Sequence, residues 1–197
     1  MGSHFFALFS RMKYINRWAL MKNTEEEPLS QHCFEVAAFA HALAIIGNKR
    51  LGKNYNAEKI AIMGMYHDMP EILTGDMPTP VKYYNSEIRE AFGKIEKTAQ
   101  NSLLGTLPED MREEYRQYLC PDEKSPEYRI VKAADKLSAL IKCIEETKSG
   151  NREFIKAEDT TRKALEDMKC EEAEIFMDEY LKSYSMVLDT VLKEEEN

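Results

Sequence analysis

The sequence has few of the residues that interrupt helices. Its 197 residues include only 8 glycines and 7 prolines, few for a sandwich or barrel with many turns. Long stretches of charged and apolar residues without such breakers favour helices. With 43% hydrophobic and 31% charged residues, the chain has the composition of a globular protein that buries its own core. We therefore expect an all-α protein, a single helical-bundle domain over residues 1–197 with no significant β-sheet.

Cysteine is also scarce, and long apolar runs are missing near the start of the chain. The four cysteines lie far apart without a Cys-x-x-Cys pair, which favours free thiols in a reducing compartment over a disulfide framework. The apolar run Phe5–Phe9 is too short to span a membrane. These features predict a cytoplasmic protein that has no membrane partner.

Positive charge is in deficit, with a formal net charge of -8. This balance argues that the protein does not bind DNA or RNA polymers, because a protein that does so normally has a basic face. A small phosphorylated substrate remains possible, because a metal ion and one or two Arg or Lys side chains make a local cationic pocket. The acidic end, at about residues 193–197, is expected to be a frayed, solvated tail.

Hydrophobic periodicity and capping residues predict helices along most of the chain. After a first helix at about 5–14 and an irregular stretch at 18–29, we expect Ser30 to cap a long helix that stops near Gly47. Asn56 is expected to cap the next helix, which is mostly apolar and ends at His67. The remaining expectations are a short helix at 70–73, a loop at 74–80, and helices at about 86–104, 108–119, 126–149 and 153–192, the last with a break near Lys169.

The histidines are the first candidates for chemistry, because there are only four. His67 is followed directly by Asp68, and one ion above a helix end can bind an imidazole nitrogen and a carboxylate oxygen together. Glu71 returns to the same side as Asp68 if the turn continues. Taken alone, however, the dipeptide His67-Asp68 is more typical of a capping pair at a helix end.

Two further residues strengthen a metal hypothesis. His32 lies in the first turn of the long predicted helix, and Asp135 follows small residues in an apolar helix. By itself, an acid such as Asp135 is more often solvated. His41 lies nine residues after His32 and faces the opposite side of that helix, so the two are not ligands of one ion. We interpret His41 and His4 as structural or surface residues.

These residues resemble the H…HD…D signature of the HD superfamily of metal-dependent phosphohydrolases. The chain is similar, more closely, to the bacterial YfbR 5′-deoxynucleotidase family from near residue 3 to beyond residue 150. The matching segments are Ser3–Ala7, Ile15–Trp18, Ser30-x-His32, Tyr66–Glu71, Leu73–Tyr83 and Lys132–Asp135. The run Thr74–Pro80 together with the His-Asp pair is the most specific part of the match. The chain departs from the family at Gln31 and at Met69-Pro70, and neither departure removes a ligand.

The resemblance implies a metal-dependent 5′-deoxynucleotidase with an HD-domain fold. One divalent transition metal ion (Co, Mn, Cu, Zn, Ni or Fe, which the sequence does not distinguish) would polarise the phosphate and lower the pKa of its bound water. The implied reaction converts a deoxyribonucleoside 5′-monophosphate to the deoxynucleoside and phosphate. The implied metal ligands are His32, His67, Asp68 and Asp135.

The resemblance also implies roles around the metal. Glu71 orients or deprotonates the attacking water, or contributes only electrostatics. Arg17 contributes to catalysis by contacting phosphate oxygens through its fork, or is a surface residue. Trp18 walls the sugar pocket and crowds a ribose 2′-hydroxyl, or is simple core. Asp76 contributes to catalysis by holding a sugar hydroxyl or the leaving oxygen, or merely stabilises its turn. The expected substrate-binding residues are Arg17, Trp18, His32, Asp68, Asp76, Met77, Pro78, Thr79 and Asp135.

Other functions remain open on the sequence. A different HD phosphohydrolase would act on an alarmone, a cyclic nucleotide or nucleoside monophosphates in general. A two-metal enzyme would need more histidine ligands, and the spare His4 and His41 are poorly placed. A nucleotide-binding regulator without catalysis and a helical scaffold with an incidental His-Asp pair are the other readings. The resemblance further implies that the protein forms a homodimer. It also implies that the small molecule it binds is a nucleoside monophosphate.

Overall fold

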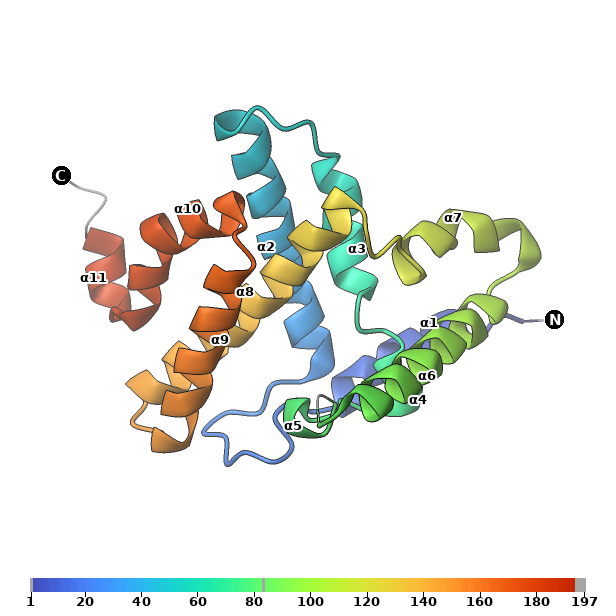
Figure 1. Ribbon diagram of the computed structural model, residues 1–197, viewed down its shortest axis with the longest axis horizontal. Coiled ribbons are helices and arrows are strands. Elements are labelled where there is room, and N and C mark those ends of the chain that lie inside the picture. Colours follow the sequence, from blue (N-terminus) through green and yellow to red (C-terminus); the bar gives the residue numbers. More distant parts are fainter. Residues whose placement is uncertain (1, 83, 194–197) are drawn as a thin grey trace.

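The computed structural model describes residues 2–82 and 84–193. Within these ranges the chain forms helices and no strand, which confirms the all-α prediction (Figure 1). Most helices are joined by short connections, and a longer irregular stretch, residues 15–28, precedes α2. An isolated bridge pairs Asn16 with Pro28. The helices are α1 (Phe5–Phe9), η1 (Ser10–Tyr14), α2 (Leu29–Arg50), α3 (Ala57–Tyr66), α4 (Glu71–Thr74), α5 (Thr79–Lys82), α6 (Ser86–Gly105), α7 (Glu109–Leu119), α8 (Pro126–Lys148), η2 (Arg152–Phe154), α9 (Ile155–Asp167), α10 (Glu171–Tyr180), η3 (Leu181–Ser185) and α11 (Leu188–Lys193).

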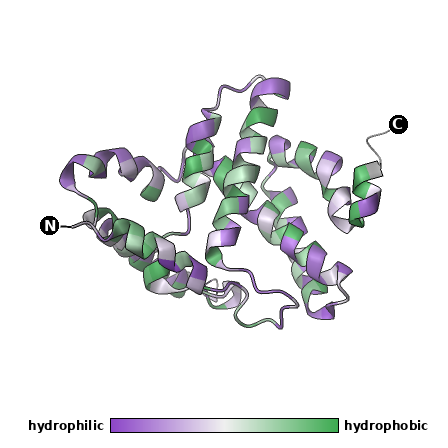
Figure 2. Ribbon diagram, turned by 180° about the vertical axis from the view of Figure 1, so that it is seen from behind, coloured by the Kyte–Doolittle hydropathy of each residue, from purple (hydrophilic) through white to green (hydrophobic). Residues whose placement is uncertain are grey.

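The centre of the fold is the packing of α2 against α3, α8 and α10. Figure 1 shows α8 crossing α2, with α1, α6 and α7 to one side and α10 and α11 to the other. The central helices carry long green, apolar stretches in Figure 2, whereas α7 is mostly purple. Apolar side chains from α2, α3, α8 and α10 form the larger buried cluster, which includes Leu43, Ile60, Leu137 and Phe176. Burial of this apolar surface is the main force that holds the four helices together.

A second, smaller core lies beside the first. It gathers residues from α1, η1, the start of α2 and the region of α6 and α7, including Phe5, Leu29, Cys33 and Leu103. Helix α2 contributes to both cores, because Leu29 and Cys33 belong to the smaller one and Val36 to the larger. The first two turns of α2 therefore lie where the two cores meet.

Helix α2 is also long and apolar enough to cross a membrane when judged by length and composition alone. Half of its apolar stretch is buried inside the protein, where α2 packs against α3 and α8. A central core helix has the same composition as a membrane span, because both are apolar on most faces.

The ends of α2 differ from the prediction. The helix begins at Leu29, and the Pro28 carbonyl accepts hydrogen bonds from the Gln31 and His32 amides at 2.9 and 3.2 Å, so Ser30 is inside the helix and does not cap it. At the other end, the helix continues past Gly47 to Arg50, and Gly52 follows with a φ of 65°. A Cβ at position 47 would come within 2.7 Å of the Tyr55 ring, so close packing explains this glycine.

Two other boundaries need correction. The predicted loop 74–80 is shorter, because Thr79 already begins α5. The predicted helix 153–192 breaks at Lys169, as expected, where φ is 49°, and again around Met186, between η3 and α11. The stretch 183–188 contains neither glycine nor proline, so no breaker residue marks this second break.

Several expectations are confirmed. The Asn56 side chain accepts a hydrogen bond from the Lys59 amide at 2.9 Å and caps α3. All four cysteines, Cys33, Cys120, Cys143 and Cys170, are free. Residues 194–197 of the predicted acidic tail lie outside the described residues.

Candidate active site

Four side chains from different parts of the chain meet where the two cores join. His32 comes from α2, His67 and Asp68 follow the end of α3, and Asp135 comes from α8. One donor atom of each lies within 4.8 Å of the others. His32 Nε2 is 3.3 Å from Asp135 Oδ1, and His67 Nε2 is 3.0 Å from Asp68 Oδ2. We call this group the His-Asp cluster.

A close approach of α2 and α3 makes the His-Asp cluster possible. A Cβ on Gly64 in α3 would lie 3.0 Å from the Ala37 Cα in α2, so a larger residue would push the two helices apart. The imidazole rings of His32 and His67 are 5.3 Å apart between centroids. Gly64 also orients the site directly, because its carbonyl oxygen lies 2.7 Å from His67 Nδ1. A proton on Nδ1 donates to that carbonyl and leaves the Nε2 lone pair facing the cluster.

His32 has a comparable partner on α8. Its Nδ1 lies 3.1 Å from Ser138 Oγ, and the Ser138 hydroxyl donates to Glu35 Oε2 at 3.2 Å. Ser138 on one side and the Arg17 guanidinium, 2.8 Å away, on the other hold the Nδ1 edge of the His32 ring, so Nε2 is the nitrogen that faces the His-Asp cluster. Sequence analysis missed Ser138 and Glu35, although Ser138 lies one turn after Asp135 in an otherwise apolar stretch.

The His-Asp cluster fits a cation. Among the described residues, four buried side-chain polar atoms have no hydrogen-bond partner, and two of them are His32 Nε2 and His67 Nε2. Burial disfavours protonation of both rings, yet the neighbouring carboxylates raise the pKa of each to about 10. His67 and His32 hold the pKa of Asp68 well below the usual range against the effect of burial, and Lys132 together with His32 does the same for Asp135. A metal ion would supply the positive charge that these carboxylates favour.

Glu71 lies beside the His-Asp cluster at the start of α4. Its side chain is buried, and Oε2 is another of the buried atoms that lack a partner. Burial and the charges of Asp68 and Asp76 raise the pKa of Glu71 to about 9, while Arg17 acts in the opposite direction. A carboxyl group with this environment is suited to proton transfer, because its pKa responds strongly to nearby charge.

Arg17 reaches the same place from the irregular residues 15–28, which we call the substrate-side segment. Its Nη1 donates to both carboxylate oxygens of Glu27 at 3.0 Å, and lies 2.8 Å from His32 Nδ1. Burial acts against its charge, but Glu27, Asp135, Asp68 and Asp76 raise the pKa of Arg17. The guanidinium is therefore a permanent positive charge beside the His-Asp cluster.

Trp18 adopts a left-handed backbone with φ of 61°, a conformation that costs a residue with a Cβ about 1–2 kcal/mol. Its Nε1 donates to Glu27 Oε2 at 2.6 Å, and its ring packs on Phe154 with centroids 5.3 Å apart. Trp18 is half-buried. These contacts keep the indole next to Arg17 in spite of the backbone strain.

The first residues of the predicted loop 74–80 lie close to the His-Asp cluster. Gly75 has a φ of 72°, and its amide donates to the Glu71 carbonyl at 2.8 Å, which ends α4. Asp76 follows, and its carboxylate interacts with Arg17 and Asp68 while burial raises its pKa. Met77 and Pro78 are half-buried, and Thr79 is exposed at the first residue of α5. The roles of Met77, Pro78 and Thr79 in substrate binding stay predictions.

The remaining histidines are exposed, as the sequence indicated: His4 precedes α1 and His41 lies on the outer side of α2. Sequence reasoning also missed Glu27, because its run Glu25-Glu26-Glu27 is typical of a solvated loop. In the structure Glu27 is only 3% exposed. The one available signal was the proline that follows it, which restricts the backbone before a helix.

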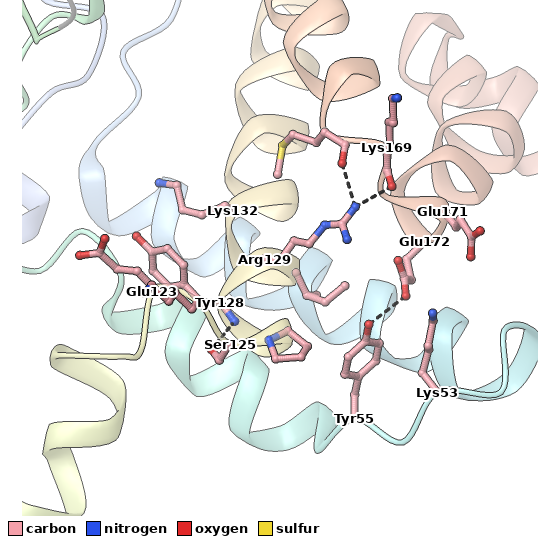
Figure 3. Close-up of a pocket in the computed structure, with 14 residues that line it drawn as sticks. Lys53, Tyr55, Glu123, Ser125, Tyr128, Arg129, Lys132, Lys169, Glu171 and Glu172 are labelled. Carbon is pink, nitrogen blue, oxygen red and sulfur yellow. Dashed lines mark hydrogen bonds between the residues drawn. The ribbon is translucent and has the colours of Figure 1, made fainter. Parts of the chain in front are cut away.

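A cavity of about 620 Å³ lies elsewhere, between the start of α8 and α10 (Figure 3). Its walls include Tyr55, whose hydroxyl donates to Glu172 at 3.1 Å. Arg129 donates to the carbonyls of Met168 and Lys169, which satisfies the end of α9. Lys132 lines this cavity and also donates to Asp135 at 3.0 Å. The cavity contacts are therefore mainly structural, and the chemistry is concentrated at the His-Asp cluster.

The arrangement defines a class. The helical bundle, together with its group of two histidines and two aspartates, belongs to the class of HD-domain phosphohydrolases. A solved HD-domain phosphohydrolase from Listeria innocua is similar in fold, with a TM-score of 0.79 and 24% identity over 92% of this chain and 88% of that chain. The cyanophage S-2L HD phosphohydrolase, bound to dA and one catalytic Zn²⁺ ion, has a TM-score of 0.63 with 15% identity, over 90% of this chain and 96% of that chain.

The sequence comparisons are more specific. The family described as 5′-deoxynucleotidase YfbR-like matches residues 4–184. A 5′-deoxynucleotidase of Erwinia tasmaniensis is 47% identical over 98% of both chains, and the 5′-deoxynucleotidase YfbR of Escherichia coli is 45% identical over 96% of both chains. The chain belongs to the YfbR-like 5′-deoxynucleotidase family.

Proposed function

We propose that the protein is a metal-dependent 5′-deoxynucleotidase, which hydrolyses deoxyribonucleoside 5′-monophosphates to deoxynucleosides and phosphate. The observation that carries this proposal is the His-Asp cluster, with unpartnered nitrogens on His32 and His67 and with Arg17 and Glu71 beside it. The 45–47% identical relatives named as 5′-deoxynucleotidases support the substrate class.

His32, His67, Asp68 and Asp135 would hold one divalent transition metal ion. Two imidazole nitrogens and two carboxylate oxygens form a borderline donor set that suits zinc and its neighbours in the first transition row. When bound, such an ion acts as a Lewis acid on the phosphate and on a water molecule. The zinc ion of the cyanophage relative supports a metal of this kind.

The protein's own residues divide the remaining tasks. Arg17 binds phosphate oxygens, because its charge is permanent and its fork matches an oxyanion. Glu71 accepts or returns a proton at the unpartnered Oε2. A cation in the cluster would lower the pKa of Glu71 from about 9 and bring it into the range where a general base works. Asp76 holds a sugar hydroxyl or the leaving oxygen, and Trp18 forms one wall of the sugar site.

A substrate panel tests the proposal. Purified protein that contains metal is assayed for phosphate release from deoxyribonucleotides and ribonucleotides, from a cyclic nucleotide and from an alarmone, with several divalent metals and with chelator. We expect release from deoxyribonucleoside monophosphates above the others, and none after chelation. Turnover of only the diester or the alarmone would point to another phosphohydrolase. Tight nucleotide binding without turnover under every metal would point to a regulator.

We also propose that the chain works as a single domain, as a homodimer and in the cytoplasm. The family membership supports the proposal of a dimer, and the free cysteines are compatible with a reducing compartment. Light scattering combined with size-exclusion chromatography measures the oligomeric state. A monomer at micromolar concentration would contradict the homodimer.

A further inference from the structure

A buried carboxylate in the substrate-side segment contacts three residues of the site at once. Glu27 is 3% exposed and accepts hydrogen bonds from Arg17 Nη1 at 3.0 Å and from Trp18 Nε1 at 2.6 Å. Its Oε1 also lies 3.5 Å from His32 Nδ1. Its main chain adds a further link, because the Glu27 carbonyl accepts the Arg17 amide at 3.0 Å.

The contacts leave part of Arg17 available. Within the described part of the chain, the side-chain hydrogen bonds of Arg17 all use Nη1. The opposite edge of the guanidinium, with Nε and Nη2, is therefore the edge that can donate to a phosphate in the bidentate geometry. Glu27 thus holds the arginine by one nitrogen and determines which way its fork points.

The contact with Trp18 has a separate consequence. The left-handed backbone of Trp18 persists only if the surroundings hold it in place. The hydrogen bond from the indole to Glu27 and the packing on Phe154 are the interactions that do so. Removing the acceptor would let the ring leave the sugar side of the site.

Backbone contacts join the two ends of the substrate-side segment to each other. Leu29 donates to the Ile15 carbonyl at 2.8 Å, and Asn16 bridges to Pro28. These bonds hold the backbone at both ends, so the side chain of Glu27 is needed mainly for the orientation of Arg17 and Trp18.

We propose that Glu27 is a positioning residue that orients Arg17 and Trp18 together, and so links phosphate binding to sugar selectivity. This inference rests on the proposed function. In this role Glu27 contacts neither the substrate nor the reacting atoms. It supplies a fixed, charged acceptor, and a charged hydrogen bond of this kind contributes more than a neutral one.

The test uses Glu27→Gln, which keeps the size of the side chain but removes the charge. Because Trp18 is the only tryptophan, its emission and its quenching by acrylamide report this residue alone, without substrate or activity. We expect the quenching constant to rise about twofold as the indole loses its charged acceptor. We expect KM for a deoxyribonucleotide to rise about tenfold, which corresponds to one charged hydrogen bond. The preference for deoxyribonucleotides over ribonucleotides should fall as KM rises.

Two further variants complete the design. Glu26→Gln removes the same charge from the neighbouring exposed residue and is expected to behave as wild type. Glu27→Asp keeps the charge on a shorter side chain, is expected to give intermediate effects, and serves if Glu27→Gln does not fold. We expect equal metal content in all variants. Metal analysis serves as the control, because general damage to the structure would also empty the His-Asp cluster.

The outcomes separate the two proposals. Unchanged quenching of Trp18 in a folded, metal-containing Glu27→Gln protein would overturn the positioning role, whatever the activity. A wild-type protein that releases no phosphate from deoxyribonucleotides would overturn the proposed function instead, while the fluorescence comparison would still decide whether Glu27 positions Trp18.

Discussion

The two halves of the candidate site are built from different kinds of structure. The His-Asp cluster comes from the core helices α2 and α8 and from the end of α3, where backbone geometry and packing determine the positions of the side chains. Arg17, Trp18 and Glu27 come from the irregular substrate-side segment, whose position depends on hydrogen bonds to other elements. The metal side is therefore expected to tolerate little displacement, and the substrate side to be adjustable between relatives.

A second buried glutamate, Glu146 on α8, attaches the substrate-side segment to the core through hydrogen bonds. Glu146 on α8 is 1% exposed and accepts hydrogen bonds from the Thr24 amide at 2.9 Å and hydroxyl at 2.7 Å. Lys142 donates to Glu146 at 2.6 Å and to the Glu25 carbonyl at 2.7 Å. Asn151 donates to Glu146 at 2.7 Å. The segment is thus attached to α8, the helix that also carries Asp135.

The largest effect is expected from the metal side. Asp68→Asn keeps the shape of a proposed ligand but removes its charge, so the cluster should lose its ion. We expect activity to fall about 1000-fold or more, equal to about 4 kcal/mol of transition-state stabilisation. Elemental analysis and phosphate release measure the two losses. His41→Ala on the exposed side of α2 is the control, and retained metal in Asp68→Asn would argue against Asp68 as a ligand.

Glu71→Gln separates proton transfer from metal binding. The variant should keep its metal, because Glu71 lies outside the His-Asp cluster, and lose about 100- to 10,000-fold in kcat, the range for a general acid or base. Steady-state kinetics with metal analysis checks both, and Glu58→Gln on the surface of α3 is the matched control. A kcat close to wild type would leave Glu71 with an electrostatic role only.

Trp18→Ala is expected to change selectivity rather than metal content. Removing the indole opens the sugar wall, so the ratio of kcat/KM for deoxyribonucleotides over ribonucleotides should fall about tenfold, as expected when a site ceases to crowd one hydroxyl. Trp18→Phe keeps a ring but loses the Nε1 donor, and should lie between the two. An unchanged ratio in Trp18→Ala would remove this residue from sugar recognition.

The smallest effect is expected from Glu146→Gln, which loosens the attachment of the substrate-side segment. Hydrogen bonds from Lys142, Asn151 and Thr24 outweigh burial and lower the pKa of Glu146 from 4.5 to about 2. Because the folded state favours the ionised form, this stabilisation is fully present above pH 4.5 and is lost as pH falls toward about 2. We expect a loss of about 1–3 kcal/mol in the free energy of unfolding at pH 7.

Urea unfolding from pH 7 down to pH 3 measures this difference. The gap between wild type and Glu146→Gln should narrow as the pH falls, whereas the exposed control Glu166→Gln should follow wild type throughout. A gap that stays constant with pH would mean that the charge of Glu146 does not contribute.

The helices and the candidate ligands could be predicted, for a physical reason. Apolar periodicity and the Asn56 cap are local signals, so helix positions followed from short stretches of sequence. Candidate metal ligands are chemically rare, and with four histidines in the chain each could be weighed separately. Helix boundaries could not be predicted in this way, because Gly47 allows close packing against Tyr55 and does not mark a helix end.

The partners that orient these residues could not be predicted in the same way. Glu27, Ser138 and Glu35 are ordinary residue types at unremarkable positions, and their roles depend on contacts between distant segments, such as the 106 positions between His32 and Ser138. Glu146 resembles any helix glutamate until the substrate-side segment is seen to cover it.

By itself, the sequence determined the helical class, the candidate ligands and the family resemblance, because these depend on residue type and local spacing. Only the tertiary structure decided that Gly64 lets α2 and α3 approach closely, and that Glu27 joins Arg17, Trp18 and His32. Burial changes what a carboxylate does: the same side chain is a solvated charge on a loop, and a directional acceptor once water is removed and its partners are fixed.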